Sequence, residues 1–285
     1  MPATLLDHLE KLYPTAKRTT FRQMIEAGRV TINGVPARTL KQPLNEEDEV
    51  QVSDRAPGRT RSPHRDAEQS RLPFGIVHED DDILVIDKPP GLLTSTVPRE
   101  KRPTALAAVR QYVSAKHPKA QVGLIHRLDR DASGLLVFSK NHEAYLSLKR
   151  QFFEHSVDRV YLALVHGTPN PRAGTIDTNL IERADGSVHS TREPKRNAER
   201  AVTHYETLES SGKQSLLRVR LETGKKHQIR AHLAERGVPI VNDPIYSDQK
   251  PSGRLLLAAV ELRLNHPRTG NRMTFQATVP AEFAI

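Results

Sequence analysis

One short turn in this sequence gathers side chains that could do chemistry. The segment reads His126-Arg-Leu-Asp129-Arg-Asp131-Ala-Ser-Gly134 and runs directly into the apolar residues Leu-Leu-Val-Phe138. Charges at the edge of a buried strand are costly unless they are paired or used. A carboxylate held there can attack a carbon atom as a nucleophile, or it can stabilise a positive charge that develops on a substrate. We therefore expect a functional site in this turn.

Mixed helices and strands are expected to position the turn. Apolar runs predict strands at 83–86, 135–138, 161–165, 216–221 and 255–264. Amphipathic spacing predicts helices at 105–113 and 142–153, the second with Tyr145, Leu146, Leu148, Phe152 and Phe153 on or near its apolar face. Helices and strands do not alternate strictly, so a doubly wound parallel sheet is not expected.

The chain of 285 residues is expected to divide into three parts, 1–53, 54–72 and 73–285. The first part begins with two short helical patterns, the second over 20–27. An Asn33-Gly34 hairpin turn between alternating residues follows. The second part, rich in arginine and proline, is typical of a flexible linker, and its arginines add non-specific phosphate contacts. The third part carries the turn around Asp129.

Composition narrows the class of protein. The net charge of +9 favours polyanionic partners such as nucleic acid. The absence of cysteine excludes disulfides, thiolate nucleophiles and cysteine-ligated metal sites. No secretory signal and no apolar run long enough to span a bilayer are recognised, so we expect a soluble, cytoplasmic protein.

Four blocks of the third part resemble, in order, the RluA-type RNA pseudouridine synthase family. The first block is Asp82-Ile-Leu-Val-Ile-Asp-Lys88-Pro-Pro-Gly91, and the second is the Asp129 turn. The third is Arg159-Val-Tyr161-Leu-Ala-Leu-Val-His-Gly167. The fourth is Leu221-Glu-Thr-Gly-Lys-Lys-His227-Gln-Ile-Arg230-Ala-His232-Leu, with the Asp243-Pro-Ile-Tyr246 that follows it. The resemblance covers about residues 74–283. It implies an α+β catalytic domain with a mostly antiparallel mixed sheet and flanking helices.

The resemblance also implies a catalytic set. Asp129 would be the catalytic carboxylate, Arg230 its charge partner, and Tyr161 the ring that stacks on a flipped uracil. An opposite charge close to a carboxylate favours the ionised form, and a guanidinium pairs with it as a planar fork. The Tyr161 hydroxyl is also a candidate to help remove the proton from carbon 5 of the base. Asp131 is expected to be structural, capping the turn with Ser133.

The first part resembles the small alpha-L RNA-binding domain named after a ribosomal protein, a small α/β domain. That resemblance implies RNA contacts by Lys17, Arg18, Arg22 and Arg29. In the catalytic part, Lys88, Arg127 and Lys225 are further candidates for RNA contact. Arg127 and Arg130 either contact phosphate or pair with nearby acids, and His126 is either an RNA contact or a structural histidine.

Three positions depart from the family pattern. Lys225 and Lys226 stand where the family usually has Arg-Thr, and Leu257 stands where it often has histidine. All three are expected to affect the choice of RNA rather than the chemistry. The polar segment 182–200, with a hairpin tip at Asp185-Gly186, is either a mobile surface loop or an RNA-gripping finger.

The sequence thus predicts a monomeric RNA pseudouridine synthase that flips a uridine and acts on structured RNA, large-subunit ribosomal RNA in the first place. Cleaving the glycosidic bond and re-attaching the base through carbon requires no redox change, so no cofactor and no metal are expected. Three alternatives remain: transfer RNA as the substrate, a non-catalytic RNA-binding or ribosome-assembly protein on the same fold, and a hydrolase that releases uracil.

Overall fold

The computed structural model describes residues 4–14, 16, 18–26, 29–45, 47–52, 72–96, 102–191 and 196–285. The chain divides into two compact units, Met1–Arg71 and Leu72–Ile285, which are treated separately. The proposed linker lies outside the described residues except for Leu72, so its extent stays a prediction. No helix in the described ranges has the length and apolarity that a bilayer crossing requires.

The N-terminal unit contains two short helices and a three-stranded sheet in the order β2-β1-β3. The elements are α1 Leu5–Leu12, α2 Arg18–Glu26, β1 Val30–Ile32, β2 Val35–Pro36 and β3 Val50–Val52. Thr4 caps α1 by accepting a hydrogen bond from the Asp7 amide, as N-cap threonines do. The predicted hairpin is confirmed, because Asn33 and Gly34 both have positive φ, at 52° and 78°.

A single mixed sheet forms the framework of the C-terminal unit. Its main order is β10-β9-β11-β12-β8-β13-β7-β5-β4, with β14 added beside β13 and β6 beside β7. The strands are β4 Gly75–Glu79, β5 Ile83–Lys88, β6 Gly123–Leu124, β7 Ser133–Ser139, β8 Asp158–His166, β9 Ala173–Glu182, β10 Val188–Thr191, β11 Glu199–Ser210, β12 Gln214–Leu221, β13 Leu257–Asn265 and β14 Arg272–Gln276. The mostly antiparallel sheet is confirmed, and the strands predicted from apolar runs lie within or overlap β5, β7, β8, β12 and β13.

The two halves of this sheet meet where β13 runs parallel to β7. Only two residue pairs form this junction, Ala258 with Ser133 and Ala259 with Gly134. Gly134 has φ of +107°, and a Cβ there would come within 2.2 Å of the Ala259 carbonyl oxygen. Only glycine therefore permits this close approach directly after the Asp129 turn.

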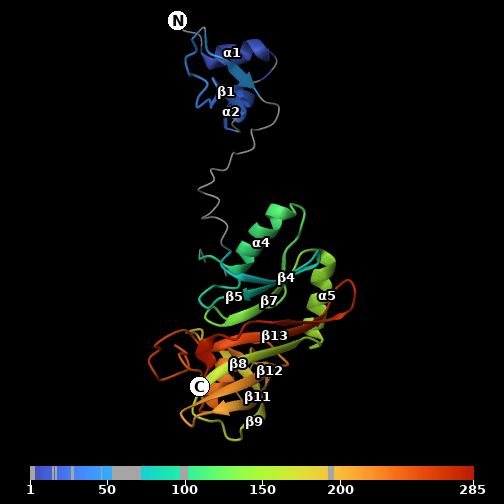
Figure 1. Ribbon diagram of the computed structural model, residues 1–285, viewed down its shortest axis with the longest axis vertical. Helices are drawn as coiled ribbons and strands as arrows, with labels where there is room; N and C mark the ends of the chain where they lie inside the picture. Colours follow the sequence, from blue (N-terminus) through green and yellow to red (C-terminus); the bar gives the residue numbers. More distant parts are fainter. Residues whose placement is uncertain are drawn as a thin grey trace. The chain divides into compact units, whose positions relative to one another are not determined.

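Helices cover both faces of the β5–β7 half of the sheet (Figure 1). They are α4 Ala105–Lys116 and α5 His142–Phe153; α6 Gln228–Glu235 packs near β10 and β11, and a 3-10 turn spans Ala281–Phe283. Leu84 and Ile86 of β5 share a core with α4, whereas Ile83 and Val85 share one with α5. Alternate residues of β5 thus pack into cores on opposite faces of the sheet, because successive side chains of a strand point to opposite faces.

The predicted apolar face of α5 is only partly right. Leu148 is fully buried, but Leu146 and Phe153 are 54% and 84% exposed. The helix packs on the sheet through a narrow stripe of Ala144, Leu148 and Gln151, because one face of a helix is enough to cover the strands beneath it. Strands β9 and β11 were not predicted, because polar residues interrupt their alternation.

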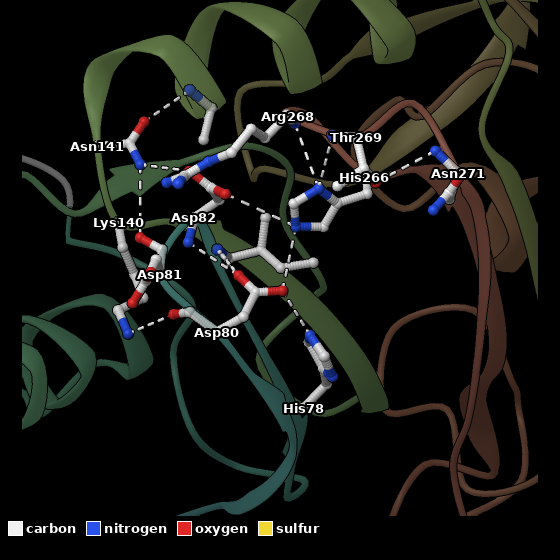
Figure 2. A network of polar contacts seen from close by, with 12 residues as sticks. His78, Asp80, Asp81, Asp82, Lys140, Asn141, His266, Arg268, Thr269 and Asn271 are labelled. Atoms are coloured by element: carbon white, nitrogen blue, oxygen red, sulfur yellow. Dashed lines mark hydrogen bonds and ion pairs between the residues drawn. The ribbon is translucent and has the colours of Figure 1, made fainter.

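A polar network ties together three connections beside the α5 N-terminus (Figure 2). Asp80, between β4 and β5, accepts from the amides of Asp82 and Ile83 and contacts His78 Nε2 at 2.7 Å. Asp82 accepts from Asn141, which caps α5, and from Arg268, in the turn between β13 and β14. Segments far apart in sequence are thereby joined.

This network includes three residues whose side chains could ligate a metal ion: Asp80, Asp82 and His266. One possible ligand atom from each lies within 4.8 Å of the other two. Both nitrogens of the His266 ring, however, already take part in hydrogen bonds. The amides of Arg268 and Thr269 donate to its Nδ1, so that nitrogen carries no proton. The proton is then on Nε2, which faces Asp80 Oδ2 at 3.2 Å. The histidine acts here as a hydrogen-bond donor to carboxylates and does not fit a metal ligand through Nε2.

Candidate active site

A cavity of about 390 Å³ opens beside the Asp129 turn. Its volume lies in the range of small-ligand sites. Strand β8, helices α5 and α6 and the turn before β7 all contribute to its wall. Apolar and cationic side chains line it together: Leu128, Tyr161, Ile229 and Leu257 on one hand, and Arg127, Lys149, Arg159, Lys225 and Arg230 on the other.

Asp129 and Arg230, predicted to be partners, lie together in this cavity. Arg230 Nη1 donates to Asp129 Oδ2 over 3.3 Å. The Asp129 side chain is 21% exposed and that of Arg230 only 2%. The carboxylate is thus open to the cavity on one side and held by a buried cation on the other. The guanidinium thus holds the carboxylate in a fixed orientation.

Asp243 is the residue that fixes Arg230, and sequence reasoning gave it no role. Its two carboxylate oxygens accept from Arg230 Nε and Nη2 at 2.8 Å each. Asp243 is fully buried and also accepts from the Ile245 and Tyr246 amides. Burial alone lowers the pKa of Arg230, but Asp243 and Asp129 outweigh it and raise that pKa. Sequence reasoning could have found Asp243, because an arginine inside a closed site needs counter-charges and Asp243 is an acidic residue of the same sequence block.

Tyr246 and His227 complete the support around this pair. The guanidinium of Arg230 lies 5.2 Å from the centroid of the Tyr246 ring, within range of a cation–π contact. The Tyr246 hydroxyl accepts from the Val188 amide and lies 3.0 Å from His227 Nδ1. His227, at the start of α6, has a left-handed φ of 51°, which is uncommon for a residue other than glycine. Burial lowers the pKa of His227.

The loop that carries Asp129 is clamped on both sides by the segment after β5. Thr94, which is buried, donates to the Leu128 carbonyl and accepts from the Leu128 amide. Lys88 Nζ and the Gly91 amide both donate to the Arg130 carbonyl. The residues before and after Asp129 are therefore held by hydrogen bonds to one connected turn.

Lys88 is not placed to contact RNA, contrary to the prediction. It is fully buried, and its ammonium donates to three backbone carbonyls, those of Pro89, Leu92 and Arg130. Three donors are thereby used. Burial lowers its pKa to about 8. In a sequence, a lysine at the end of an apolar run is normally expected to be exposed. Here the lysine is buried because it donates to three backbone carbonyls.

Replacing Lys88 with methionine is expected to lower the free energy of unfolding by about 2–4 kcal/mol, because buried carbonyls lose their donor. The rate on saturating RNA is expected to fall by about 10²-fold, since Asp129 loses its fixed position. Thr94→Val, which keeps the volume but removes the hydroxyl, should show the same pattern more weakly. Chemical unfolding and single-turnover kinetics measure both effects. Equal rates for Lys88→Met and the exposed control Lys213→Met would contradict the clamp.

Tyr161 lies in β8 and lines the cavity, as the predicted stacking role requires. It is 5% exposed, and burial raises the pKa of its hydroxyl. A raised pKa keeps the phenol protonated at neutral pH, which favours stacking and hydrogen-bond donation over proton removal.

The cavity is also lined by the other residues that were expected to influence RNA binding: Arg127, Lys225, Lys226 and Leu257. Arg127 is exposed and is one of the lining residues. Lys225 also lines the cavity, but its ammonium pairs with Glu199 at 2.6 Å. Lys226 pairs with Glu182 in the same manner, at 2.5 Å. Leu257 contributes an apolar surface to the wall. All three departures from the family pattern therefore lie at this cavity.

Two open alternatives in the turn are resolved by its contacts. Arg130 pairs with Asp131 through two hydrogen bonds, so Asp131 is structural, although no cap with Ser133 forms among the described contacts. His126 Nε2 accepts from the Val137 amide, and its ring stacks on Phe152. Burial, Arg159 and Lys149 lower its pKa to about 3. His126 is therefore a neutral structural histidine.

The segment 182–200 begins as the predicted hairpin. Strands β9 and β10 pair across a turn in which Gly186 has φ of +82°. Residues 192–195 lie outside the described residues.

In the N-terminal unit, a second cavity of about 300 Å³ gathers basic side chains. The predicted Arg18 and Arg22 line it together with Arg38 and Lys41, which sequence reasoning missed. Arg29 is half-buried, and Lys17 lies outside the described residues. Four cations around one hollow suit a polyanion.

Comparison with known proteins agrees with this fold and site. Residues 82–235, more than half of the chain, match the model of the RNA pseudouridylate synthase family, and residues 12–50 match the S4 domain. The fold and the cavity thus define an RNA-modifying isomerase with an appended RNA-binding domain. The chain belongs to the RNA pseudouridylate synthase family.

Two relatives are similar along nearly the whole chain. One is "Uncharacterized RNA pseudouridine synthase YlyB" of Bacillus subtilis, 34% identical over 94% of this chain and 87% of the relative. Another is "Ribosomal large subunit pseudouridine synthase D" of Nitrosomonas europaea, 32% identical over 97% and 81%. Among solved structures, "Human RNA Pseudouridylate Synthase Domain Containing 4" matches with a TM-score of 0.62 and 27% identity, over 73% of this chain and 90% of that chain.

Proposed function

We propose that this protein isomerises uridine to pseudouridine in large-subunit ribosomal RNA, with Asp129 as its catalytic residue. The observation that carries the proposal is the position of Asp129, whose carboxylate is open to the cavity and paired from behind with the buried Arg230. Relatives from Nitrosomonas europaea and Pasteurella multocida named as ribosomal large subunit pseudouridine synthase D support the choice of RNA.

The chemistry requires three events at one nucleotide. The bond between C1′ of the ribose and N1 of the base breaks, the uracil turns, and a bond from C1′ to C5 forms. The hydrogen on C5 leaves as a proton, and N1 gains a proton, so the composition of the RNA does not change. Nothing is oxidised or reduced, and the reaction as written needs no cofactor.

Each residue of the proposed set has one task. The Asp129 carboxylate either attacks C1′ or stabilises and deprotonates the cationic sugar that forms when the base departs. Arg230 orients the Asp129 carboxylate through the hydrogen bond from its Nη1. Tyr161 stacks on the flipped uracil, and Leu128, Ile229 and Leu257 provide the apolar wall that a base taken out of its stack requires.

The N-terminal unit is proposed to supply affinity rather than chemistry. Its cavity with Arg18 and Arg22 fits phosphate contacts, and Arg29 and Lys17 belong to the same proposal. In the catalytic unit, Arg127 and Lys225 at the cavity are the proposed RNA contacts. We propose residues 1–53, 54–72 and 73–285 as binding domain, linker and catalytic domain of a monomer that acts in the cytoplasm.

Mapping of pseudouridines in total RNA tests the function. Cells with the intact gene and cells with a deletion are compared in ribosomal and transfer RNA. We expect sites in large-subunit ribosomal RNA to disappear in the deletion and to return with the gene. Loss of sites in transfer RNA alone would overturn the proposed substrate, and release of free uracil would indicate a hydrolase. No change in any RNA would favour a non-catalytic RNA-binding protein.

A further inference from the structure

Arg159, in β8, is a buried cation that the proposed reaction does not use. It is 8% exposed. Its guanidinium makes one hydrogen bond, from Nη2 to the neutral carbonyl of Glu222, and its Nε is buried without a partner. Among the described residues no carboxylate forms an ion pair with it. A buried charge left without a counter-charge is costly, so a position like this one calls for an anion from outside the chain.

The surroundings of Arg159 hold its guanidinium in one place. The centre of the guanidinium lies 5.5 Å from the centroid of the Phe152 ring. On another side is Gly224, where a Cβ would come within 2.5 Å of Arg159 Nη1. The absence of a side chain at this position thus makes room for the guanidinium. These contacts give the Arg159 guanidinium a fixed position, unlike that of a mobile side chain at the surface.

The charge around Arg159 has the sign that an anion requires. Lys149 lines the same cavity, as does Lys225, whose ammonium is paired with Glu199. His126, close to Arg159 and Lys149, has a pKa lowered to about 3 by burial and by these two cations. Asp129, the carboxylate in this cavity, is already paired with Arg230. Among the described residues, Arg159 and Lys149 therefore have no carboxylate partner, whereas Lys225 pairs with Glu199.

We propose that Arg159 binds a phosphodiester group of the RNA, next to the nucleotide whose uracil stacks on Tyr161. The inference rests on the proposed function and names a subsite of it. Arg159 and Tyr161 are two residues apart on β8 and face the same cavity, about 6.6 Å apart along the strand. One nucleotide spans such a distance from its base to its phosphate. A planar fork with free N–H groups suits two phosphate oxygens.

The test compares Arg159→Met and Arg159→Lys in the full chain, with a fluorescent oligouridylate as the probe. Methionine should weaken binding by about tenfold or more, because a charge-assisted contact is lost. The plot of log affinity against log salt should become less steep by about 0.7, the value for one phosphate on a single strand. Lysine should keep the slope and recover part of the affinity. Arg263→Met, which removes an exposed arginine paired with Glu261, is the matched control.

A second measurement separates binding from a structural role. Without RNA, Arg159→Met is expected to melt at the same temperature as the wild type or higher, since an uncompensated buried charge is removed. Gly224→Ala keeps the charge but displaces the guanidinium, and it should lose affinity in the same way. A lower melting temperature with unchanged affinity and salt slope would overturn the inference.

Turnover distinguishes the two proposals. If affinity is unchanged in Arg159→Met but the rate at saturating ribosomal RNA falls, the guanidinium acts on the uracil, and the phosphate subsite is wrong. If the wild type forms no pseudouridine, the proposed function fails, whereas the binding and salt data still decide the role of Arg159.

Discussion

Asp129→Asn is expected to lose about 10⁴-fold or more in the rate of pseudouridine formation while it keeps its fold and its affinity for RNA. Asparagine has the shape of aspartate, and its oxygen can still accept from Arg230 Nη1. It lacks the negative charge that either attacks C1′ or stabilises a cationic sugar. The effect therefore falls on the chemical step alone. Release of tritium from ribosomal RNA labelled at carbon 5 of uridine measures it.

Asp131→Asn is the matched control, since it makes the same change two residues away in the same loop. Asp131 pairs with Arg130 at the surface of the turn, and exposed pairs contribute less than about 1 kcal/mol. We expect a rate within a few-fold of the wild type. Comparable activity of Asp129→Asn and Asp131→Asn would rule out the proposed catalytic residue.

Asp243→Asn is expected to be the most damaging change outside the cavity wall. It leaves Arg230 buried without its bidentate partner and places an amide group against the guanidinium. Breaking a buried pair in this way costs about 3–5 kcal/mol. The rate at saturating RNA should also fall, by about 10²-fold, because Asp129 loses its oriented partner. Urea unfolding and single-turnover kinetics give the two values.

The double variant Arg230→Met with Asp243→Asn separates stability from catalysis. Both charges are removed, and the asparagine oxygen can still accept from the Ile245 and Tyr246 amides. Stability should recover most of what Asp243→Asn loses, because no uncompensated charge remains. The rate should stay low, since Asp129 has no cation behind it. Recovery of both stability and rate would mean that Arg230 has only a structural part.

The N-terminal unit could be predicted well because its signals are local. The helix around Leu5 and Leu9 follows from spacing, and the hairpin follows from Asn33-Gly34, whose backbone angles few other residues adopt as readily. The same holds for Ile83–Lys88 and Ser133–Ser139, where apolar runs fix buried strands. Strands β9 and β11 lack such runs, and they are stabilised by pairing with neighbours rather than by their own pattern.

Sequence by itself determined the family, the mostly antiparallel architecture and the segments that carry Asp129, Tyr161 and Arg230, because residue types at fixed spacing are written along the chain. The pairing of Asp129 with Arg230 was expected from the family resemblance, whereas tertiary structure alone decided the other charge contacts. It paired Arg230 with Asp243, turned Lys88 inward onto the Arg130 carbonyl and left Arg159 buried without a carboxylate. The physical reason is that a charge is stabilised or destabilised by what surrounds it in space, and burial and counter-charge arise only when distant segments pack together.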